Sequence, residues 1–194
     1  MGRRVLHDEF FQRAKRDGYV ARSAYKLLEI QERSKLIKPG DRVLDLGCAP
    51  GSWLQVADRI VGERGTLVGV DLQATRVHGL RNARTIVGDV TTLELKELLD
   101  DGERFDVLLS DMAPSTSGHG DDLVSARLCR EVLAIATQTL REGGKLAMKI
   151  LEGAEYPAVV AETKSMFRTA RGLKPRATRT VSREMFIIGD GFRP

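Results

Sequence analysis

The sequence predicts an α/β fold in which a mostly parallel sheet carries helices on both faces. Short apolar runs alternate with segments of helical periodicity, and no linker or internal repeat interrupts this alternation. Because consecutive parallel strands need a long crossover, usually a helix, the alternation is typical of βαβ units. The expected strands are 42–47, 66–71, 84–87, 105–110 and 145–151, followed by extended segments at 173–179 and 185–189. The expected helices are 22–36, 53–61, 123–140 and 157–167.

Each element in the first half of the chain has a local signal. Apolar residues over 22–36 recur at the spacing of one helical face, and the breaker Lys38-Pro39-Gly40-Asp41 follows them. The run 42–47 is short, apolar and closed by a glycine, which is typical of a buried strand. Helical spacing returns over 53–61. The next strand-like runs each end near an acid, at Asp71, Asp89 and Asp111.

The second half of the chain continues the pattern. An amphipathic helix is predicted over 123–140, and Gly143-Gly144 is expected to stop it before the strand 145–151. With 194 residues the chain is long enough for one hydrophobic core and short for two. We therefore expect a single domain over 1–194, with a basic helical segment at about 1–38.

Composition excludes several classes of protein. Hydrophobic residues make up 42% and charged residues 30%, which rules out wholesale disorder. No apolar run approaches the ~18 residues of a membrane span, and acids interrupt the N-terminal region before a signal peptide can form. Cys48 and Cys129 are too few for a disulfide framework and lack the spacing of a zinc site. We expect a cytoplasmic, monomeric protein without a metal.

The basic residues are concentrated at the two ends of the chain. The net charge is +4, yet residues 1–40 hold ten basic and five acidic side chains, and 168–183 holds six basic ones and no acid. The remaining residues therefore sum to −7. Basic flanks around an acidic body fit a protein that grips phosphates, and the helix near 8–17 and the run 168–183 are the candidates. The alternative is a solvated surface of uneven charge.

The turn after the first predicted strand is the first candidate ligand site. It reads Asp45-Leu46-Gly47-Cys48-Ala49-Pro50-Gly51-Ser52-Trp53, and in a doubly wound sheet it would lie at the carboxyl edge, where ligands bind. The turn is neither a Walker loop nor G-x-G-x-x-G, so a nucleoside without phosphates fits it better than a dinucleotide. Asp71, 20 residues after Gly51, stands where such folds have an acid on the ribose hydroxyls. Asp89, followed by Val90, is the candidate for an adenine edge.

Four segments of the chain together resemble the FtsJ-type RNA ribose 2′-O-methyltransferases. They are Ala21-Arg22-Ser23-Ala24-Tyr25-Lys26-Leu27, Asp45 to Trp53, Ser110-Asp111-Met112-Ala113-Pro114 and Ser182-Arg183-Glu184. The resemblance runs in the same order from about residue 8 to the end. It implies a Rossmann-like class I fold with a seven-stranded sheet, S-adenosylmethionine (SAM) as cofactor and RNA as partner. Cys48, Ser52 and Ser115-Thr116 depart from the usual residues; the loop change affects local substrate contacts rather than the reaction.

The resemblance also implies a catalytic tetrad, which falls on Lys26, Asp111, Lys149 and Glu184. Position supports it, because Lys149 shares its strand face with Lys145 and Ala147, where a buried lysine is costly without a partner or a task. The alternative for each member is a structural ion pair, and for Lys26 also a solvated helix position.

SAM contacts carried over from the family form a larger set. They are Gly47, Pro50, Gly51, Trp53, Asp71, Leu72, Asp89, Val90 and Asp111. Turn geometry and core packing explain Pro50, Leu72 and Val90 equally well, and Trp53 could instead hold its helix against the sheet.

The resemblance implies attack of a ribose oxygen on the electrophilic methyl group of SAM, held about 3–3.5 Å away. A neutral Lys149 is the expected general base, since desolvation and a second ammonium group, that of Lys26, lower the pKa of a lysine. Asp111 favours the charged form, so we expect it to orient Lys149 and contact the methionine end of SAM. Glu184 and Lys26 would align the ribose.

The expected target is a uridine in large-subunit (23S) ribosomal RNA or in the large ribosomal subunit, because the chain has no added RNA-binding domain. A tRNA 2′-O-methyltransferase and a noncatalytic RNA-binding ribosome-assembly factor are the alternatives. A base methyltransferase is disfavoured, since no aromatic residue stands beside Pro114 and neither cysteine follows a proline. A nicotinamide dehydrogenase fits the spacing of Asp71 but lacks the glycine pattern.

Overall fold

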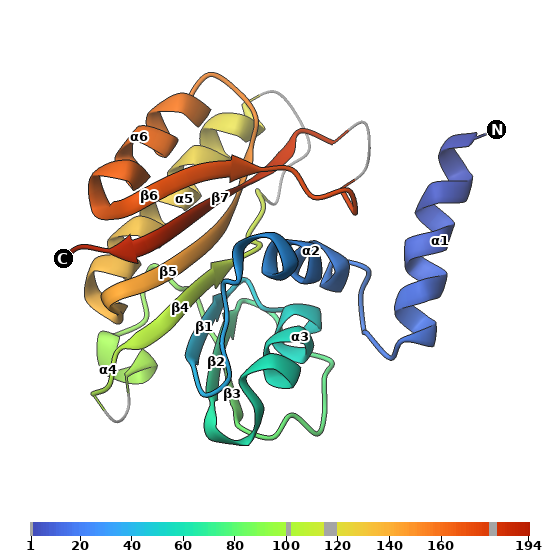
Figure 1. The fold of residues 1–194 in the computed structure, drawn as a ribbon, viewed down its shortest axis with the longest axis horizontal. Helices are drawn as coiled ribbons and strands as arrows, with labels where there is room; N and C mark the ends of the chain where they lie inside the picture. Colours follow the sequence, from blue (N-terminus) through green and yellow to red (C-terminus); the bar gives the residue numbers. More distant parts are fainter. Residues whose placement is uncertain (1, 100–101, 115–119, 179–181) are drawn as a thin grey trace.

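The computed structural model describes residues 2–99, 102–114, 120–178 and 182–194, and its centre is a seven-stranded sheet (Figure 1). The strands are β1 Arg42–Leu46, β2 Thr66–Asp71, β3 Ala83–Val87, β4 Phe105–Ser110, β5 Leu140–Leu151, β6 Phe167–Leu173 and β7 Glu184–Phe192. The helices are α1 Gly2–Arg16, α2 Ala24–Ser34, α3 Ser52–Val61, the 3-10 turn η1 Gly62–Arg64, α4 Leu95–Leu98, α5 Asp121–Thr139 and α6 Tyr156–Met166.

The strand order is β3-β2-β1-β4-β5-β7-β6. Neighbouring strands from β3 to β5 run parallel, and β7 runs antiparallel to both β5 and β6. This arrangement confirms the predicted mostly parallel sheet. It brings the carboxyl ends of β1, β2, β4 and β5 to one edge, beside the amino end of β7.

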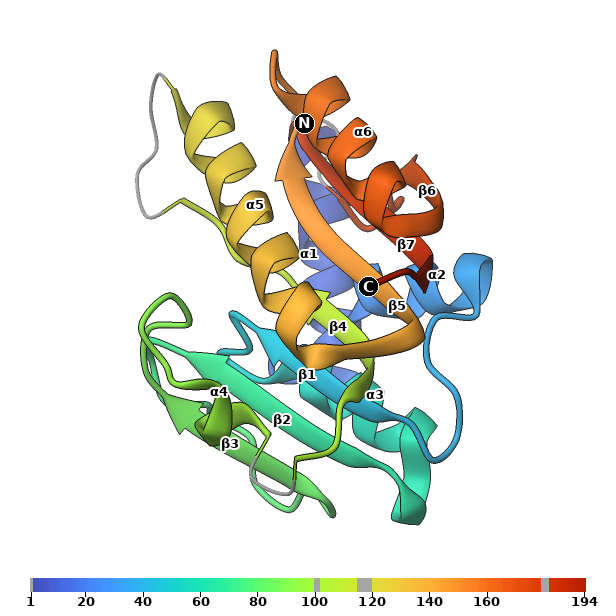
Figure 2. The same cartoon turned by 90° about the vertical axis from the view of Figure 1, so that its left-hand side faces the viewer.

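Helices cover both faces of the sheet, as predicted. In Figures 1 and 2, α5 and α6 lie on one face and α2 and α3 on the other. Alternate side chains of each strand enter the two cores: Val43 and Leu109 pack with α2 and α3, whereas Leu44 and Leu108 pack with α5. The continuous apolar character of these strands follows from burial on both faces.

The predicted helix end at Leu140 is correct to within one residue, but the predicted strand start at Lys145, with Gly143-Gly144 as a separate breaker, is wrong. Helix α5 ends at Thr139, and β5 begins at Leu140, which pairs with Phe105. The register between β4 and β5 shifts just after this pair, and Gly143 has a φ of 75°. The two glycines therefore mark an irregularity inside the strand. Leu140 and Phe105 are both completely buried, so tertiary packing decides where the helix ends.

The predicted extended segment 173–179 is also misplaced. The strand in this region is β6, which begins at Phe167, a residue that the periodicity assigns to the preceding helix. Phe167 is buried against Phe192 of β7, with ring centroids 5.3 Å apart, and this contact fixes the start of the strand. Pro175 cannot donate to a strand ladder, in keeping with an end of β6 at Leu173.

The predicted basic helix near 8–17 is present as α1, which lies outside α2 (Figure 1). Ala14 is buried, and the ring of Phe10 lies 5.6 Å from that of Tyr25. The link between α1 and α2 is held by Gln55 of α3, whose amide donates to the Gly18 carbonyl and whose oxygen accepts from the Val20 N–H.

Candidate active site

A tight turn between β1 and α3 forms one wall of the site. Gly47 and Gly51 have φ angles of 78° and 110°, which disfavour any other residue. A Cβ atom at Gly47 would lie 2.6 Å from Met112 Cγ, and one at Gly51 would overlap Val77. Pro50 follows a cis peptide bond in this turn. The glycines predicted in this turn are therefore required both by their positive φ and by the close packing of Met112 and Val77 against them.

Asp71 lies at the end of β2 and holds this turn in place. One of its carboxylate oxygens accepts from the Ala49 N–H at 2.9 Å and the other from the Gln73 N–H at 2.9 Å. The neighbouring Leu72 is 71% exposed at the same edge. The structure thus brings three predicted cofactor contacts, Gly51, Asp71 and Leu72, to one edge of the sheet. Their contact with SAM stays a prediction.

Asp89 and Val90 follow the end of β3 at the neighbouring corner of the sheet. The Asp89 carboxylate accepts hydrogen bonds from the N–H and the hydroxyl of Thr91, and these bonds lower the pKa of Asp89. Val90 is partly buried against the core on the α5 side. The Gly88 N–H donates to the Asp71 carbonyl, which ties this corner to β2.

Trp53 lies inside the protein between α2 and the sheet. Its indole N–H donates to the Ser23 carbonyl at 2.9 Å, and its ring lies 5.6 Å from that of Phe186. The hydroxyls of Ser23 and Ser52 are 2.8 Å apart. Trp53 thus holds the start of α2 against α3, the structural role considered as the alternative to cofactor contact.

The four predicted catalytic residues come together although 158 positions separate the first from the last. Lys149 Nζ lies 3.1 Å from Asp111 Oδ1, and it donates to the Asp111 main-chain oxygen at 2.6 Å. Lys26 Nζ lies 3.0 Å from Glu184 Oε2 and 3.9 Å from Asp111 Oδ1. The result is a row of alternating charge, Lys149, Asp111, Lys26 and Glu184, contributed by β5, the end of β4, α2 and β7.

Both lysines of this row are buried, with exposed fractions of 8% for Lys26 and 7% for Lys149. Burial raises the pKa of Glu184. The ammonium group of Lys26, its hydrogen bond and the charge of Lys149 lower this pKa by more than burial raises it, so the net shift is downward. Glu184 is therefore a carboxylate at neutral pH. Two cations and two anions balance one another in this row, which reduces the cost of burying them.

Asp45 is a buried acid at the start of the candidate ligand turn for which the sequence motif predicted no separate role. It is 1% exposed, and neither carboxylate oxygen has a hydrogen-bond partner among the described residues. Burial raises the pKa of Asp45 well above its ordinary value, and the neighbouring carboxylates of Asp111 and Asp71 raise it further. A signal was present in the sequence, since Asp45 interrupts an apolar strand that ends at the candidate ligand turn.

The two cysteines are buried and uncharged. Burial raises the pKa of the Cys48 thiol far above its usual range, and it raises the pKa of Cys129 to about 12. Neither thiol can supply a thiolate near neutral pH, which argues against cytosine C5 chemistry. Cys129 instead donates to the Lys149 carbonyl at 3.2 Å, so α5 contacts the backbone that carries this lysine.

One hollow outside this constellation, of about 790 Å³, runs between α1, α2 and the segment after β6, and it is lined by Arg13, Glu29, Lys174 and Arg176 among others. The backbone N–H of Arg176 donates to the Glu29 carboxylate at 2.6 Å. The two predicted basic segments therefore face one groove. Arg179, from the same basic run, and Ser115-Thr116, from the loop after Pro114, lie outside the described residues.

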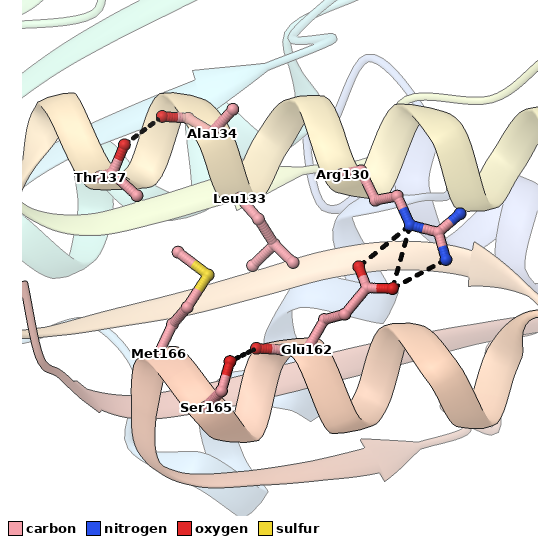
Figure 3. Close-up of a pocket in the computed structure, with 7 residues that line it drawn as sticks. All are labelled: Arg130, Leu133, Ala134, Thr137, Glu162, Ser165 and Met166. Atoms are coloured by element: carbon pink, nitrogen blue, oxygen red, sulfur yellow. Dashed lines mark hydrogen bonds and ion pairs between the residues drawn. The ribbon is translucent and has the colours of Figure 1, made fainter.

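A hollow of about 130 Å³ between α5 and the segment after β3 is lined by the predicted cofactor contact Val90, with Thr91 and Leu93. Another hollow, of about 300 Å³, lies between α5 and α6 and contains none of the predicted site residues (Figure 3). Arg130 crosses it and makes ion pairs with Glu155 and Glu162 at 2.9 and 2.8 Å. Leu133 and Met166 form its apolar lining. Its charged groups satisfy one another.

Across the described ranges, no cluster of three or more His, Cys, Asp and Glu residues could hold a metal ion. Within the same ranges, no helix combines the length and apolar character needed to cross a membrane.

The sheet edge fits a nucleoside cofactor that carries positive charge. The turn between β1 and α3 can be built only with glycine at Gly47 and Gly51, and both carboxylate oxygens of the buried Asp45 lack a hydrogen-bond partner among the described residues. With the strand order and the antiparallel β7, these features define a class I SAM-dependent methyltransferase. A family model described as FtsJ-like methyltransferase matches residues 19–192, and the chain belongs to this family. The predicted fold, enzyme class and cofactor are confirmed.

Individual relatives cover nearly the whole chain. "Ribosomal RNA large subunit methyltransferase E" of Desulfatibacillum aliphaticivorans is 42% identical over 97% of this chain and 92% of the relative. The protein of the same name from Methanothermobacter thermautotrophicus is 43% identical over 96% of this chain and 90% of the relative. A solved structure described as a ribosomal RNA methyltransferase from Plasmodium falciparum superposes with a TM-score of 0.79 and 28% identity, covering 90% of this chain and 98% of that one.

Proposed function

We propose that this protein transfers a methyl group from SAM to the ribose 2′-hydroxyl of a uridine in large-subunit (23S) ribosomal RNA. The names of its relatives support large-subunit ribosomal RNA as the substrate. The observation that carries the chemistry is the buried row Lys149, Asp111, Lys26 and Glu184 at the carboxyl edge of the sheet. A protein that only binds RNA has no need to bury two lysines against two acids at the edge of the sheet where the ligand binds, so this row favours an enzyme.

Lys149 is the proposed general base. When bound, SAM supplies an electrophilic methyl group on a sulfonium, which an alcohol attacks only as it loses its proton. One N–H of Lys149 donates to the Asp111 main-chain oxygen at 2.6 Å, which fixes the direction of the amine. To act as a base, Lys149 first gives up the ammonium proton that it holds in its ion pair with Asp111, and the lone pair of the amine then takes the 2′-hydroxyl proton. Burial of Lys149 keeps water from competing for that lone pair.

The other members of the row position the reactants. The Asp111 carboxylate lies between the two ammonium nitrogens, 3.1 Å from that of Lys149 and 3.9 Å from that of Lys26, and is the group suited to hold Lys149 in place. Lys26 and Glu184 form the outer pair, 3.0 Å apart. A carboxylate and an ammonium side by side can accept from and donate to neighbouring ribose oxygens.

The cofactor contacts are proposed on the same edge. The turn at Gly47, Pro50 and Gly51 would take the adenosine side of SAM, Asp71 the ribose hydroxyls, and Asp89 with Val90 the adenine edge. Asp111 would face the methionine end. Leu72 and Trp53 complete the proposed set, with Trp53 acting through the packing of α2 rather than through its N–H.

The groove between α1 and the segment 174–177 is the proposed path for RNA. Its cationic side chains belong to the two ends of the chain where positive charge is concentrated. The groove also borders α2, the helix that carries Lys26. Phosphates held there would lie beside the catalytic row, which is what a substrate strand needs.

A methyl-transfer assay tests the proposal. Labelled SAM is supplied with total ribosomal RNA, large subunits or tRNA from cells that lack this protein, and the nucleosides are separated by mass spectrometry. We expect 2′-O-methyluridine from the large-subunit samples. Label on tRNA alone would favour the tRNA alternative, label on a base would exclude ribose chemistry, and SAM binding without any transfer would favour the noncatalytic reading.

Lys149→Ala tests the role of the base. Loss of a general base lowers kcat by roughly 10²–10⁴-fold, measured at saturating SAM. Lys145→Ala is the matched control, because Lys145 lies on the same face of β5 but donates to the Lys35 carbonyl away from the row. If Lys149→Ala kept more than about a tenth of the wild-type kcat, the assignment of the base would fail.

A further inference from the structure

The carboxyl group of Asp45 is the least satisfied polar group near the proposed reaction centre. Both of its oxygens are buried and have no hydrogen-bond partner within the described part of the chain. An unpaired carboxyl in such a position costs several kcal/mol of folding free energy unless something compensates it. Buried polar groups in native proteins are rarely left in this state, so the exception calls for an explanation.

The sheet register places Asp45 directly behind the catalytic row. Asp45 pairs with Leu109, which pairs with Ala147. Asp111 and Lys149 lie two residues further along the same two strands, so they occupy the next position on the same face. Val43, Leu109 and Ala147 belong to the core on the α2 and α3 side, and Asp45 alternates onto that face with Val43.

Among the described residues, the charged groups around Asp45 leave its carboxyl without a counter-ion. Asp111 at the end of β4 and Asp71 at the end of β2 both disfavour a negative charge on Asp45, and the Cys48 thiol beside it is uncharged. The nearby cations are already paired, Lys149 with Asp111 and Lys26 with Glu184. In the protein without ligand, a proton on Asp45 removes the uncompensated charge.

We propose that Asp45 carries a proton in the free enzyme and releases it when the positive charge of SAM enters the site, so that cofactor binding is linked to proton release. SAM has a net charge of +1 at neutral pH, whereas the product S-adenosylhomocysteine has lost the sulfonium and has no net charge. The proton passes to the buffer on binding and returns as the neutral product forms. Asp45 thus favours the charged cofactor over its product. The inference rests on the proposed position of the cofactor at this edge.

Calorimetry in buffers of different ionisation enthalpy measures the number of protons released on binding. At pH 7 we expect SAM binding to release up to about one proton, and S-adenosylhomocysteine to release distinctly fewer. Asp45→Asn, which keeps the shape and cannot ionise, should release none. Asp41→Asn is the matched control: burial also raises the pKa of Asp41, but it lies before the opposite end of β1, and the proton count should stay at the wild-type value.

Lys149 is the competing source of a proton, because a general base must be neutral when it acts. Lys149→Met separates the two sources. If Lys149→Met abolishes proton release while Asp45→Asn retains it, the inference is wrong. A wild-type protein that binds SAM with no dependence on the buffer also overturns it, whereas failure to bind SAM at all contradicts the proposed function instead.

A measurement on the wild-type protein tests the same inference without depending on whether the variants fold. Because the proton is released on binding, SAM affinity should rise with pH between about 6 and 8, by up to about tenfold per pH unit. The affinity for S-adenosylhomocysteine should rise less steeply. If the affinities for SAM and S-adenosylhomocysteine rose equally steeply with pH, the positive charge of SAM could not be the cause of proton release, and the inference would be wrong.

Discussion

At the scale of single residues, the site depends on charges that the fold places in contact. Lys26, Asp111, Lys149 and Glu184 come from four elements, and each ion pair compensates a group that burial alone would disfavour. Their identity could be expected from motifs and from the cost of burying a lysine. Their mutual distances could not, because no local pattern relates α2 to β7.

The paired state of Glu184 predicts a change in acid stability. Its pKa is lowered in the folded protein, so its ion pair contributes stability above the unfolded pKa, and this contribution is lost as pH falls through the folded value. Glu184→Gln should therefore lose less thermal stability than the wild-type protein between about pH 5 and pH 3. Melting temperatures across this range measure it, with the exposed Glu142→Gln as control. Parallel curves for the wild type and Glu184→Gln would contradict the prediction.

At the scale of elements, the turn between β1 and α3 combines backbone strain with close approach. Gly51 has a φ of 110°, and a Cβ there would overlap Val77. The glycine pattern of this turn was visible in the sequence, but the neighbour that fills the space was not. Val77 comes from the segment between β2 and β3, which has no regular secondary structure.

Gly51→Ala should weaken SAM binding by about tenfold or more, because ~1–3 kcal/mol of backbone strain and the overlap with Val77 would displace the turn. Gly62→Ala provides the matched control. Its φ is also positive, at 67°, so alanine is strained there too, but no atom lies within 4 Å of the added Cβ and the residue follows α3 at its far end. Titration with SAM measures the affinities. If both substitutions weakened SAM binding equally, general destabilisation of the protein, rather than displacement of the turn between β1 and α3, would be the cause.

The boundaries of helices and strands could not all be predicted from local sequence patterns. The alternation of strands and helices predicts β1 to β5 in order, and the edge strand β6 is misplaced because its start depends on Phe167 meeting Phe192. The exposed Arg168 and Arg171 along β6 hide the alternation expected of a strand. Charged side chains of this kind are typical of an edge that must avoid pairing with another chain.

At the scale of the whole molecule, folding gathers the two basic ends of the chain around one groove. Arg13 from α1 and Lys174 and Arg176 from the segment after β6 line it together. The charge count predicted two phosphate-binding flanks, and the tertiary structure brings the two flanks together. The groove is also lined by residues of α2, the helix that carries Lys26.

Charge reversal tests the groove. Lys174→Glu combined with Arg176→Glu should weaken RNA binding. The slope of the logarithm of the RNA association constant against the logarithm of salt concentration should become shallower by about 1–2, because fewer counterions are released. SAM affinity should not change. Lys96→Glu on α4, which is exposed and does not line the groove, is the control. Filter binding over a range of salt concentrations measures the slope, and a slope equal to the wild-type value would exclude these residues from the RNA path.

The sequence by itself determined the α/β class, the enzyme family, the glycine turn and which four residues were expected to meet at the site. These features are encoded locally, in hydrophobic periodicity, turn chemistry and short motifs. Only the tertiary structure decided that β5 begins at Leu140, that β6 begins at Phe167, that the two basic ends share a groove, and that Asp45 lies behind Asp111 without a hydrogen-bond partner in the described part of the chain. The physical reason is that burial and ion pairing depend on contacts between residues far apart along the chain. Local periodicity does not identify which residues will make these contacts.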